Sequence, residues 1–122
     1  MIVEERRYTF FPGKLQVFLH LYAQEGMKVQ RRYLRHLLGY YVSEIGQLNQ
    51  ITALWGYPSL REREEWREAL FADPAWIAFV DKVRPLMTNQ ECRLLKPAPF
   101  FKDDLSAFLS AQNSNGGNNN VL

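Results

Sequence analysis

Cysteine is almost missing from this chain of 122 residues, in which Cys92 is the only one. A single cysteine cannot form a disulfide within the chain. A free thiol fits a reducing compartment, so we expect a cytoplasmic protein. Cys92 falls in a segment with strand character, where a lone cysteine usually packs as a small apolar side chain. We therefore do not expect it to act as a nucleophile.

Long apolar runs are missing as well. No stretch approaches the roughly 20 apolar residues that a membrane-spanning helix needs. The first ten residues, MIVEERRYTF, contain neither the apolar core of a signal peptide nor an Arg/Ser-rich transit segment. We expect no insertion into a membrane.

The sequence offers little that would hold a metal or a cofactor. It has no phosphate-binding loop, dinucleotide fingerprint, serine nucleophile elbow or Cys–His arrangement. His20 lies off the apolar stripe of its predicted helix, and His36 is placed to interact with the C-terminus of a helix. Neither histidine has a second ligand at metal-binding spacing. We expect neither a metal nor a cofactor.

A strong charge of one sign is absent too, because the formal net charge is +2. The densest basic run consists of Lys28, Arg31, Arg32, Arg35 and His36. At helical spacing these side chains fall on more than one face, which favours a solvated surface over a binding patch. No RNA-binding aromatic signature or zinc-finger spacing accompanies them, so we expect no nucleic-acid partner.

What the chain does contain is a regular succession of strand and helix patterns, in a length suited to one domain. Apolar alternation or short apolar runs predict strands over residues 1–9, 37–43, 47–57 and 91–95. A helix is predicted from the stripe Leu15, Phe18, Leu19 and Tyr22, and it should resume after Gly26 over residues 27–36. Two further helices are expected between the third and the fourth of these strands.

These segments have clear start signals. Ser59 and Glu62 form a capping box, which predicts a helix over Leu60–Phe71 with Trp66, Ala69 and Leu70 facing inward. Asp73 and Pro74 start another helix. Its apolar stripe is Trp76, Phe79, Val80 and Val83, and Pro85 ends it. The resulting order, β-α-β-β-α-β, predicts an α+β, ferredoxin-like fold with an antiparallel sheet.

The end of the chain reads as an extension of this domain. We expect the domain to occupy residues 1–100 and the extension residues 101–122. The extension contains a short helix with Leu105, Phe108 and Leu109 on one face. An Asn/Gly-rich stretch over residues 113–120 follows and is expected to be mobile.

The third predicted strand is apolar on both faces. One face carries Asn49, Ile51, Ala53, Trp55 and Tyr57, and the other carries Leu48, Gln50, Thr52 and Leu54. Helices on one side of the sheet cover only one of these faces. An uncovered face carrying Trp and Tyr would be an unusually large apolar patch for a monomer. The sequence therefore predicts a homodimer in which a second copy covers that face.

Several motifs resemble a known family. They are IVEERRYTF-x-PGK at residues 2–14, QRR-x-L-x-x-LLGYY at residues 30–41, EIG-x-LNQ-x-x-x-LWGY-x-SL-x-ERE at residues 44–64, and DPAW at residues 73–76. On these motifs the first 100 residues resemble the NIPSNAP family, of the dimeric α/β-barrel, ferredoxin-like superfamily. The resemblance implies two sheets joined into a barrel-like dimer. It implies little chemistry: eukaryotic members are associated with mitochondria, vesicle traffic and protein scaffolding.

One position departs from the family pattern. The family often has a histidine two residues before the tryptophan of the LWGY motif, and here that position is Ala53. A histidine there would be the natural acid–base group of a pocket. Its replacement by alanine argues against proton-transfer catalysis.

The candidate site is the face shared by the first and third predicted strands. It would line the barrel lumen with Glu4, Arg6, Tyr8, Asn49, Trp55 and Tyr57. Arg6 suits a bidentate hold on an anion, and a phenol suits hydrogen bonding to a developing oxyanion. The competing interpretation is that Glu4 and Arg6 merely pair with each other, and that the aromatic rings are interface packing.

Two functional hypotheses follow. The first is a homodimeric module that binds a small molecule or a protein, with a small hydrophobic or anionic ligand as the possible occupant. The second is a cofactor-independent oxygenase or isomerase that acts on a small hydrophobic or aromatic substrate in the barrel.

Overall fold

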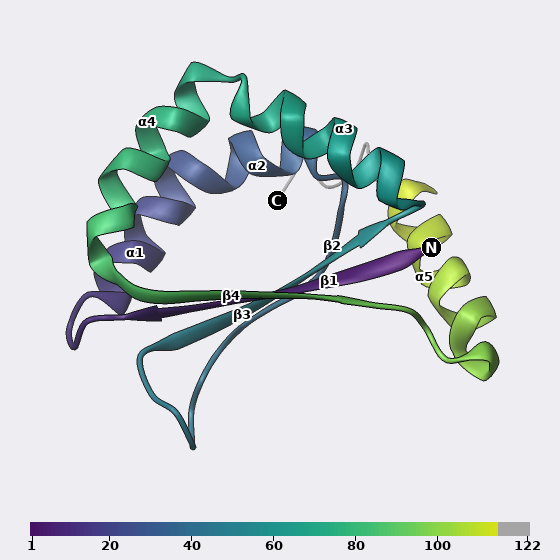
Figure 1. The fold of residues 1–122 in the computed structure, drawn as a ribbon, viewed down its shortest axis with the longest axis horizontal. Helices are drawn as coiled ribbons and strands as arrows, with labels where there is room; N and C mark the ends of the chain where they lie inside the picture. The colour runs from purple at the N-terminus through teal and green to yellow at the C-terminus, as the bar shows by residue number, and fades with distance from the viewer. Residues whose placement is uncertain (115–122) are drawn as a thin grey trace.

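The computed structural model describes residues 1–114. One four-stranded antiparallel sheet carries a layer of helices on one face (Figure 1). The strands are β1 (Ile2–Phe10), β2 (His36–Val42), β3 (Gln50–Tyr57) and β4 (Met87–Leu95). The helical segments are α1 (Leu15–Leu21), η1 (Tyr22–Gly26), α2 (Met27–Tyr33), α3 (Leu60–Phe71), α4 (Pro74–Val83), η2 (Arg84–Leu86), η3 (Pro99–Phe101) and α5 (Lys102–Ser114).

The sheet order is β2-β3-β1-β4, and it confirms the predicted ferredoxin-like α+β fold. The sheet is open, with β2 and β4 at its edges, so the two central strands are β1 and β3. Their register places Glu4 opposite Trp55 and Arg6 opposite Ala53. Directly paired residues point to the same side of a sheet, so the predicted sharing of one face by Glu4, Arg6, Tyr8, Trp55 and Tyr57 is correct.

The side of the sheet on which this face lies was predicted wrongly. Trp55 and Tyr57 do not lie on an uncovered face, because both are at most 1% exposed in the core beneath the helices. The open face of β3 instead carries Thr52, Leu54 and Gly56. The larger rings go under the helices because burying them removes more apolar surface from water.

The helical segment that follows β1 is interrupted by a single wide turn. Gly26 closes the π-helical segment η1, which links α1 to α2, as the predicted interruption at this residue suggested. A Cβ atom at Gly26 would lie 2.7 Å from Cζ of Phe79, too close for any real contact. Glycine is therefore required here so that the backbone of η1 can press against a ring from α4.

Some element boundaries differ from the predicted ones. α2 ends at Tyr33, because Leu34 is extended and almost fully buried. His36 therefore starts β2, where its ring lies 5.7 Å from that of Trp66, and it caps no helix. β3 starts at Gln50 because Asn49 has a φ of 59°, which strand geometry does not allow. β4 begins four residues earlier than predicted.

The helix caps agree with the sequence. The Ser59 side chain accepts a hydrogen bond from the backbone N–H of Glu62, and Asp73 accepts one from that of Ala75. Both fix the start of a helix that crosses the sheet. One inward residue of α3 was predicted wrongly: Ala69 is exposed, and Arg67, predicted to face solvent, takes its place toward the sheet.

The last helix, α5, lies on the other side of the sheet from α1–α4 (Figure 1). Leu105 and Leu109 are buried, whereas Phe108 is 49% exposed and does not share their contact. A Cβ atom at Gly56 would lie 3.5 Å from Leu109, so α5 covers the open face at this end. Most of the predicted Asn/Gly-rich stretch lies outside the described residues. No helix within residues 1–114 is long and apolar enough to cross a membrane.

Candidate functional site

A fully buried carboxylate stands at the centre of the helix-covered face. Glu4 on β1 is 0% exposed. It accepts hydrogen bonds from Arg63 Nε at 2.9 Å and Nη2 at 2.6 Å, and from Arg6 Nη1 at 3.2 Å. Tyr57 Oη donates to it at 3.1 Å, and the thiol of Cys92 at 3.2 Å. Burial of a carboxylate is tolerated only when its oxygens are satisfied in this way.

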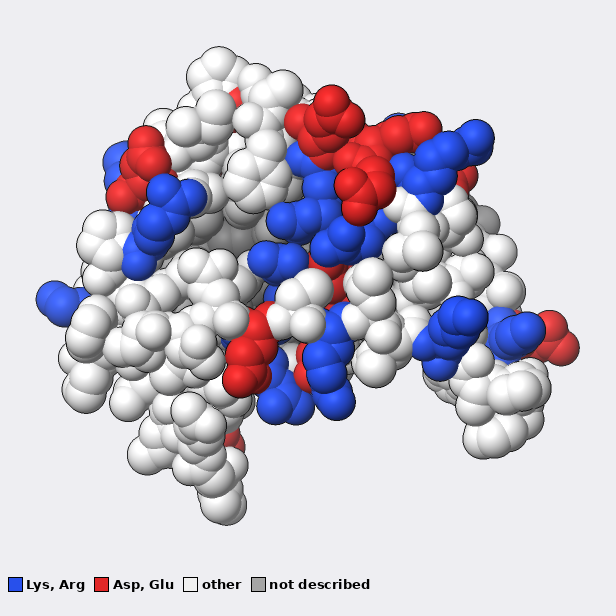
Figure 2. Space-filling model, viewed as in Figure 1, with Lys and Arg blue, Asp and Glu red and all other residues white. Residues whose placement is uncertain are grey.

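Cationic groups outnumber the carboxylate that they surround. Arg67 Nη1 is a third guanidinium near Glu4, at 3.9 Å from Oε1. The side chains of Arg6, Arg63 and Arg67 are only 14%, 17% and 22% exposed, so their charges are poorly screened by water. Figure 2 shows Lys and Arg side chains gathered between α3 and the sheet, beside a hollow in the surface.

Burial and charge act on Glu4 in opposite directions. Burial alone raises the pKa of Glu4, but the hydrogen bond from Arg63 and the charges of Arg6 and Arg67 outweigh it. The pKa is therefore held below its usual value. A carboxylate that stays ionised and is saturated with donors is a poor proton acceptor.

Cys92 differs from the predicted buried position. It is exposed on the edge strand β4, although its thiol reaches Glu4. An edge strand is covered on one side only, so even a helix-facing residue there remains open to solvent. Burial, then the hydrogen bond and the charge of Glu4, raise the pKa of the Cys92 thiol. The thiol is therefore a hydrogen-bond donor at neutral pH and not a reactive thiolate.

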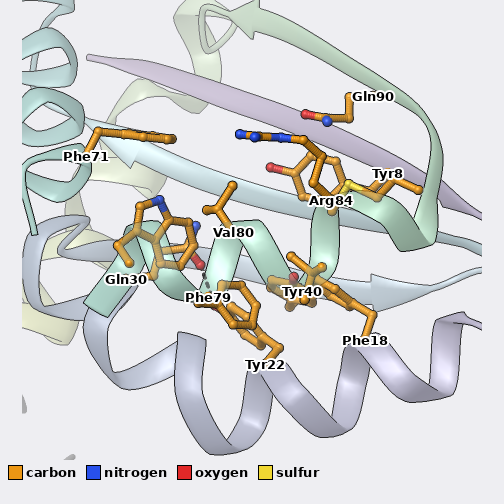
Figure 3. Close-up of a pocket in the computed structure, with 13 residues that line it drawn as sticks. Tyr8, Phe18, Tyr22, Gln30, Tyr40, Phe71, Phe79, Val80, Arg84 and Gln90 are labelled. Atoms are coloured by element: carbon orange, nitrogen blue, oxygen red, sulfur yellow. Dashed lines mark hydrogen bonds between the residues drawn. The ribbon is translucent and has the colours of Figure 1, made fainter. Parts of the chain in front are cut away.

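A cavity of about 100 Å³ lies between the helices and the sheet (Figure 3). Seven of its lining side chains are aromatic: Tyr8, Phe18, Tyr22, Tyr40, Phe71, Trp76 and Phe79. Val80 and Val83 of α4 and Met87 of β4 complete the apolar wall, and Gln30, Arg84 and Gln90 add polar groups. A concave, ring-lined space with a few polar groups is typical of a small-molecule site.

The polar groups of the cavity are held by their neighbours. Tyr22 Oη donates a 2.6 Å hydrogen bond to Gln30 Oε1, which leaves the amide –NH₂ of Gln30 as a donor. Burial raises the pKa of Tyr22 and of Tyr40, so both phenols stay protonated. Trp76 is 7% exposed, and its indole N–H has no acceptor among the described residues.

Two side chains connect the cavity to the arginine cluster, which consists of Arg6, Arg63 and Arg67 around Glu4. Tyr8 lines the cavity and accepts a 2.7 Å hydrogen bond from Arg6 Nε, and the Arg6 guanidinium lies 5.6 Å from its ring centroid. Phe71 lines the cavity as well, and Arg67 stacks over its ring at 5.4 Å. The cationic and aromatic parts therefore form one continuous site.

The predicted site residues are only partly brought together. Glu4, Arg6, Tyr8 and Tyr57 form one hydrogen-bonded network, which includes the predicted pairing of Glu4 with Arg6. Trp55 lies on the same face in the core. Asn49 lies apart in the loop before β3, where its backbone carbonyl accepts from Phe10. No group of three potential metal ligands occurs in residues 1–114.

Sequence reasoning missed Arg63 and Arg67, and most of the cavity wall. Helical spacing places four residues on one face of α3: Arg63, Trp66, Arg67 and Leu70. Two of them, Trp66 and Leu70, were already predicted to face inward. Extending that stripe to its charged members would have identified both arginines. The cavity itself has no local signal, because its wall combines residues from four α-helices, two shorter helical segments and three strands.

The fold and the motifs of this site match a family model. The model for NIPSNAP matches residues 3–102, which is most of the chain. The chain belongs to the NIPSNAP family. The protein NipSnap of Drosophila melanogaster is 31% identical to this chain over a matched region. That region covers 81% of this chain and 36% of the Drosophila protein. This NIPSNAP chain thus spans about a third of the length of that relative.

Solved structures support the same assignment. A NIPSNAP family protein with unknown function from Agrobacterium tumefaciens has 39% identity and a TM-score of 0.79, over 82% of this chain and 90% of that one. A putative antibiotic biosynthesis monooxygenase from Nitrosomonas europaea has a TM-score of 0.60, over 80% of this chain and 98% of that one. At 11% identity that likeness shows the ferredoxin-like fold alone.

Proposed function

We propose that this NIPSNAP chain is a small-molecule-binding protein and that the ring-lined cavity is its binding site. The observation that carries the proposal is the wall of seven aromatic side chains around the cavity. Close packing normally removes such a space. An occupant with a flat apolar body fills it.

The volume limits the occupant to a small molecule. An apolar cavity of about 150 Å³ holds a benzene molecule. At about 100 Å³ this cavity is smaller, so a single ring is the upper limit for its occupant. This size favours a small molecule over a protein segment as the ligand of the first hypothesis.

The test is to fill the cavity. Val80 of α4 projects into the cavity (Figure 3), so Val80→Phe should abolish binding of benzamide, a neutral one-ring probe. Saturation-transfer NMR detects such weak binding directly. Ile77→Phe is the matched control, because Ile77 lies on the same helix and is 45% exposed. Equal benzamide signals from Val80→Phe and wild type, both folded by circular dichroism, would contradict the cavity as the site.

We further propose that two copies pair through the open face of the sheet. Partly or largely exposed apolar side chains, including Tyr41 at 57%, Leu95 at 37% and Leu54, favour this contact. Trp55, which motivated the predicted dimer, is buried on the helix-covered face and is not available for this contact. The helix α5 already covers one end of the open face. Light scattering at micromolar concentration should give twice 14.3 kDa. A mass of one chain would end the proposal.

The titratable groups of the site do not favour the oxygenase or isomerase hypothesis. Glu4 is held ionised by its cationic neighbours, while Tyr22 and Tyr40 are held protonated by burial. None of these three groups is tuned for proton transfer near neutral pH. The binding hypothesis therefore has the stronger support.

A cytoplasmic location stays part of the proposal. It is supported by the free thiol of Cys92, which is exposed on β4. Exposed free thiols are more common in reducing compartments than in oxidising ones.

A further inference from the structure

We infer that the ligand is a small aromatic carboxylate, a singly charged anion whose ring fills the cavity and whose carboxylate lies at the mouth between Arg67 and Arg84. The inference rests on the proposed function, since it names the chemical class that the cavity binds. Three features carry it: an arginine with spare donors that stacks on a ring of the cavity wall, a second arginine that lines the cavity, and the local balance of charge.

Arg67 is held in place without using its hydrogen bonds. Its closest carboxylate oxygen, Glu4 Oε1, is 3.9 Å away, beyond hydrogen-bond distance. Its plane stacks on Phe71, a wall of the cavity. No acceptor among the described residues takes a hydrogen bond from Arg67. A guanidinium fixed by stacking, with its N–H groups unused, is prepared to bind a carboxylate through two parallel hydrogen bonds.

Arg84 supplies the second cation. It follows the end of α4 and lines the cavity, and in the view of Figure 3 its guanidinium lies between Tyr8 and Phe71. Its partner Asp81 is distant, at 3.8 Å, and both side chains are largely exposed. A pair of this kind contributes little and is easily exchanged. Arg84 is therefore free to turn toward a bound anion.

The balance of charge around the mouth fits one negative charge. Four arginines, Arg6, Arg63, Arg67 and Arg84, are paired with three carboxylates, Glu4, Glu64 and Asp81. One unit of positive charge is therefore left over. A carboxylate neutralises it, whereas a phosphate group, with close to two negative charges near pH 7, would leave an excess. The cavity behind the mouth takes a ring, so the two parts together specify an aromatic carboxylate.

Benzoate and benzamide test this assignment because they share size and shape and differ in charge. In titrations followed by NMR, benzoate should bind wild type about tenfold more tightly than benzamide, the difference expected of a charge-assisted contact. Arg67→Gln and Arg84→Gln should each weaken benzoate binding more than benzamide binding, so that most of that preference is lost. Arg61→Gln is the control: Arg61 lies on α3, is 80% exposed and pairs with Glu65 on the solvent side.

The outcomes separate the inference from the proposed function. If benzamide and benzoate bind equally and the arginine variants change neither, the cavity is a binding site but the ligand class is wrong. If Arg61→Gln weakens benzoate as much as Arg67→Gln does, general attraction to a basic surface explains the preference, and the inference fails. If neither probe binds wild type, the proposed function fails and the inference fails with it.

Discussion

Replacement of Glu4 by glutamine should destabilise the fold by about 3–5 kcal/mol, the cost of removing one partner from a buried charge network. Glu4 is fully buried, and the side chains of its three arginine partners are at most 22% exposed. Without the carboxylate, three like charges remain close together in a poorly hydrated site. Urea unfolding of wild type and Glu4→Gln measures the difference directly.

Glu5→Gln is the matched control on the same strand. Glu5 faces the open side of the sheet and pairs with Arg7 and Arg93, whose side chains are 41% and 61% exposed. Glu5 is itself 14% exposed, but its partners are open to water and screen its charge, so Glu5→Gln should cost clearly less than Glu4→Gln. A loss of similar size in both variants would show that the arginine cluster needs no buried counter-charge, contrary to the site described above.

The cost of Glu4→Gln should also depend on pH. The pKa of Glu4 is lowered on folding from its ordinary value of 4.5. A group of this kind contributes stability that is fully present above the unfolded pKa and is lost as pH falls through the folded pKa. The gap in unfolding free energy between wild type and Glu4→Gln should therefore be constant above about pH 5.5 and narrow below pH 4.5. A gap that widens in acid would be inconsistent with a carboxylate that stays ionised in the fold.

Trp55→Ala should have a comparable effect, about 3–5 kcal/mol, because it leaves a large cavity in the core. Trp55 is 1% exposed beneath the helices. Leu54→Ala changes the neighbouring residue, which points to the open face and is partly exposed, and it should cost clearly less. Thermal and urea unfolding of both variants tests which face of β3 is the core. A larger loss from Leu54→Ala in a protein shown to be monomeric would reverse that assignment.

The features predicted correctly from the sequence are those with local causes. The caps at Ser59 and Asp73 depend on side chains within three residues of the backbone groups that they satisfy. The shared face of Glu4, Arg6 and Tyr8 follows from the alternation of a strand, whatever its surroundings. The succession of strands and helices then limits the topology to very few folds, and the observed sheet order is the expected one.

The features that were missed depend on long-range packing. β3 is apolar on both sides, so its alternation does not distinguish the covered face from the open one. The inward position of Arg67 was not predicted, because the inner face of α3 was assigned from apolar residues only. The cavity exists because Tyr8, Phe71 and Phe79 converge from β1, α3 and α4, and no short stretch of sequence records that convergence.

The contact between Gly26 and Phe79 fixes the position of one ring of the cavity wall. The ring of Phe79 lines the cavity and also packs against the backbone of Gly26. Any side chain at position 26 would force the ring to move and would change the shape of the cavity. The size of the proposed ligand is thus limited partly by Gly26, a residue that does not line the cavity itself.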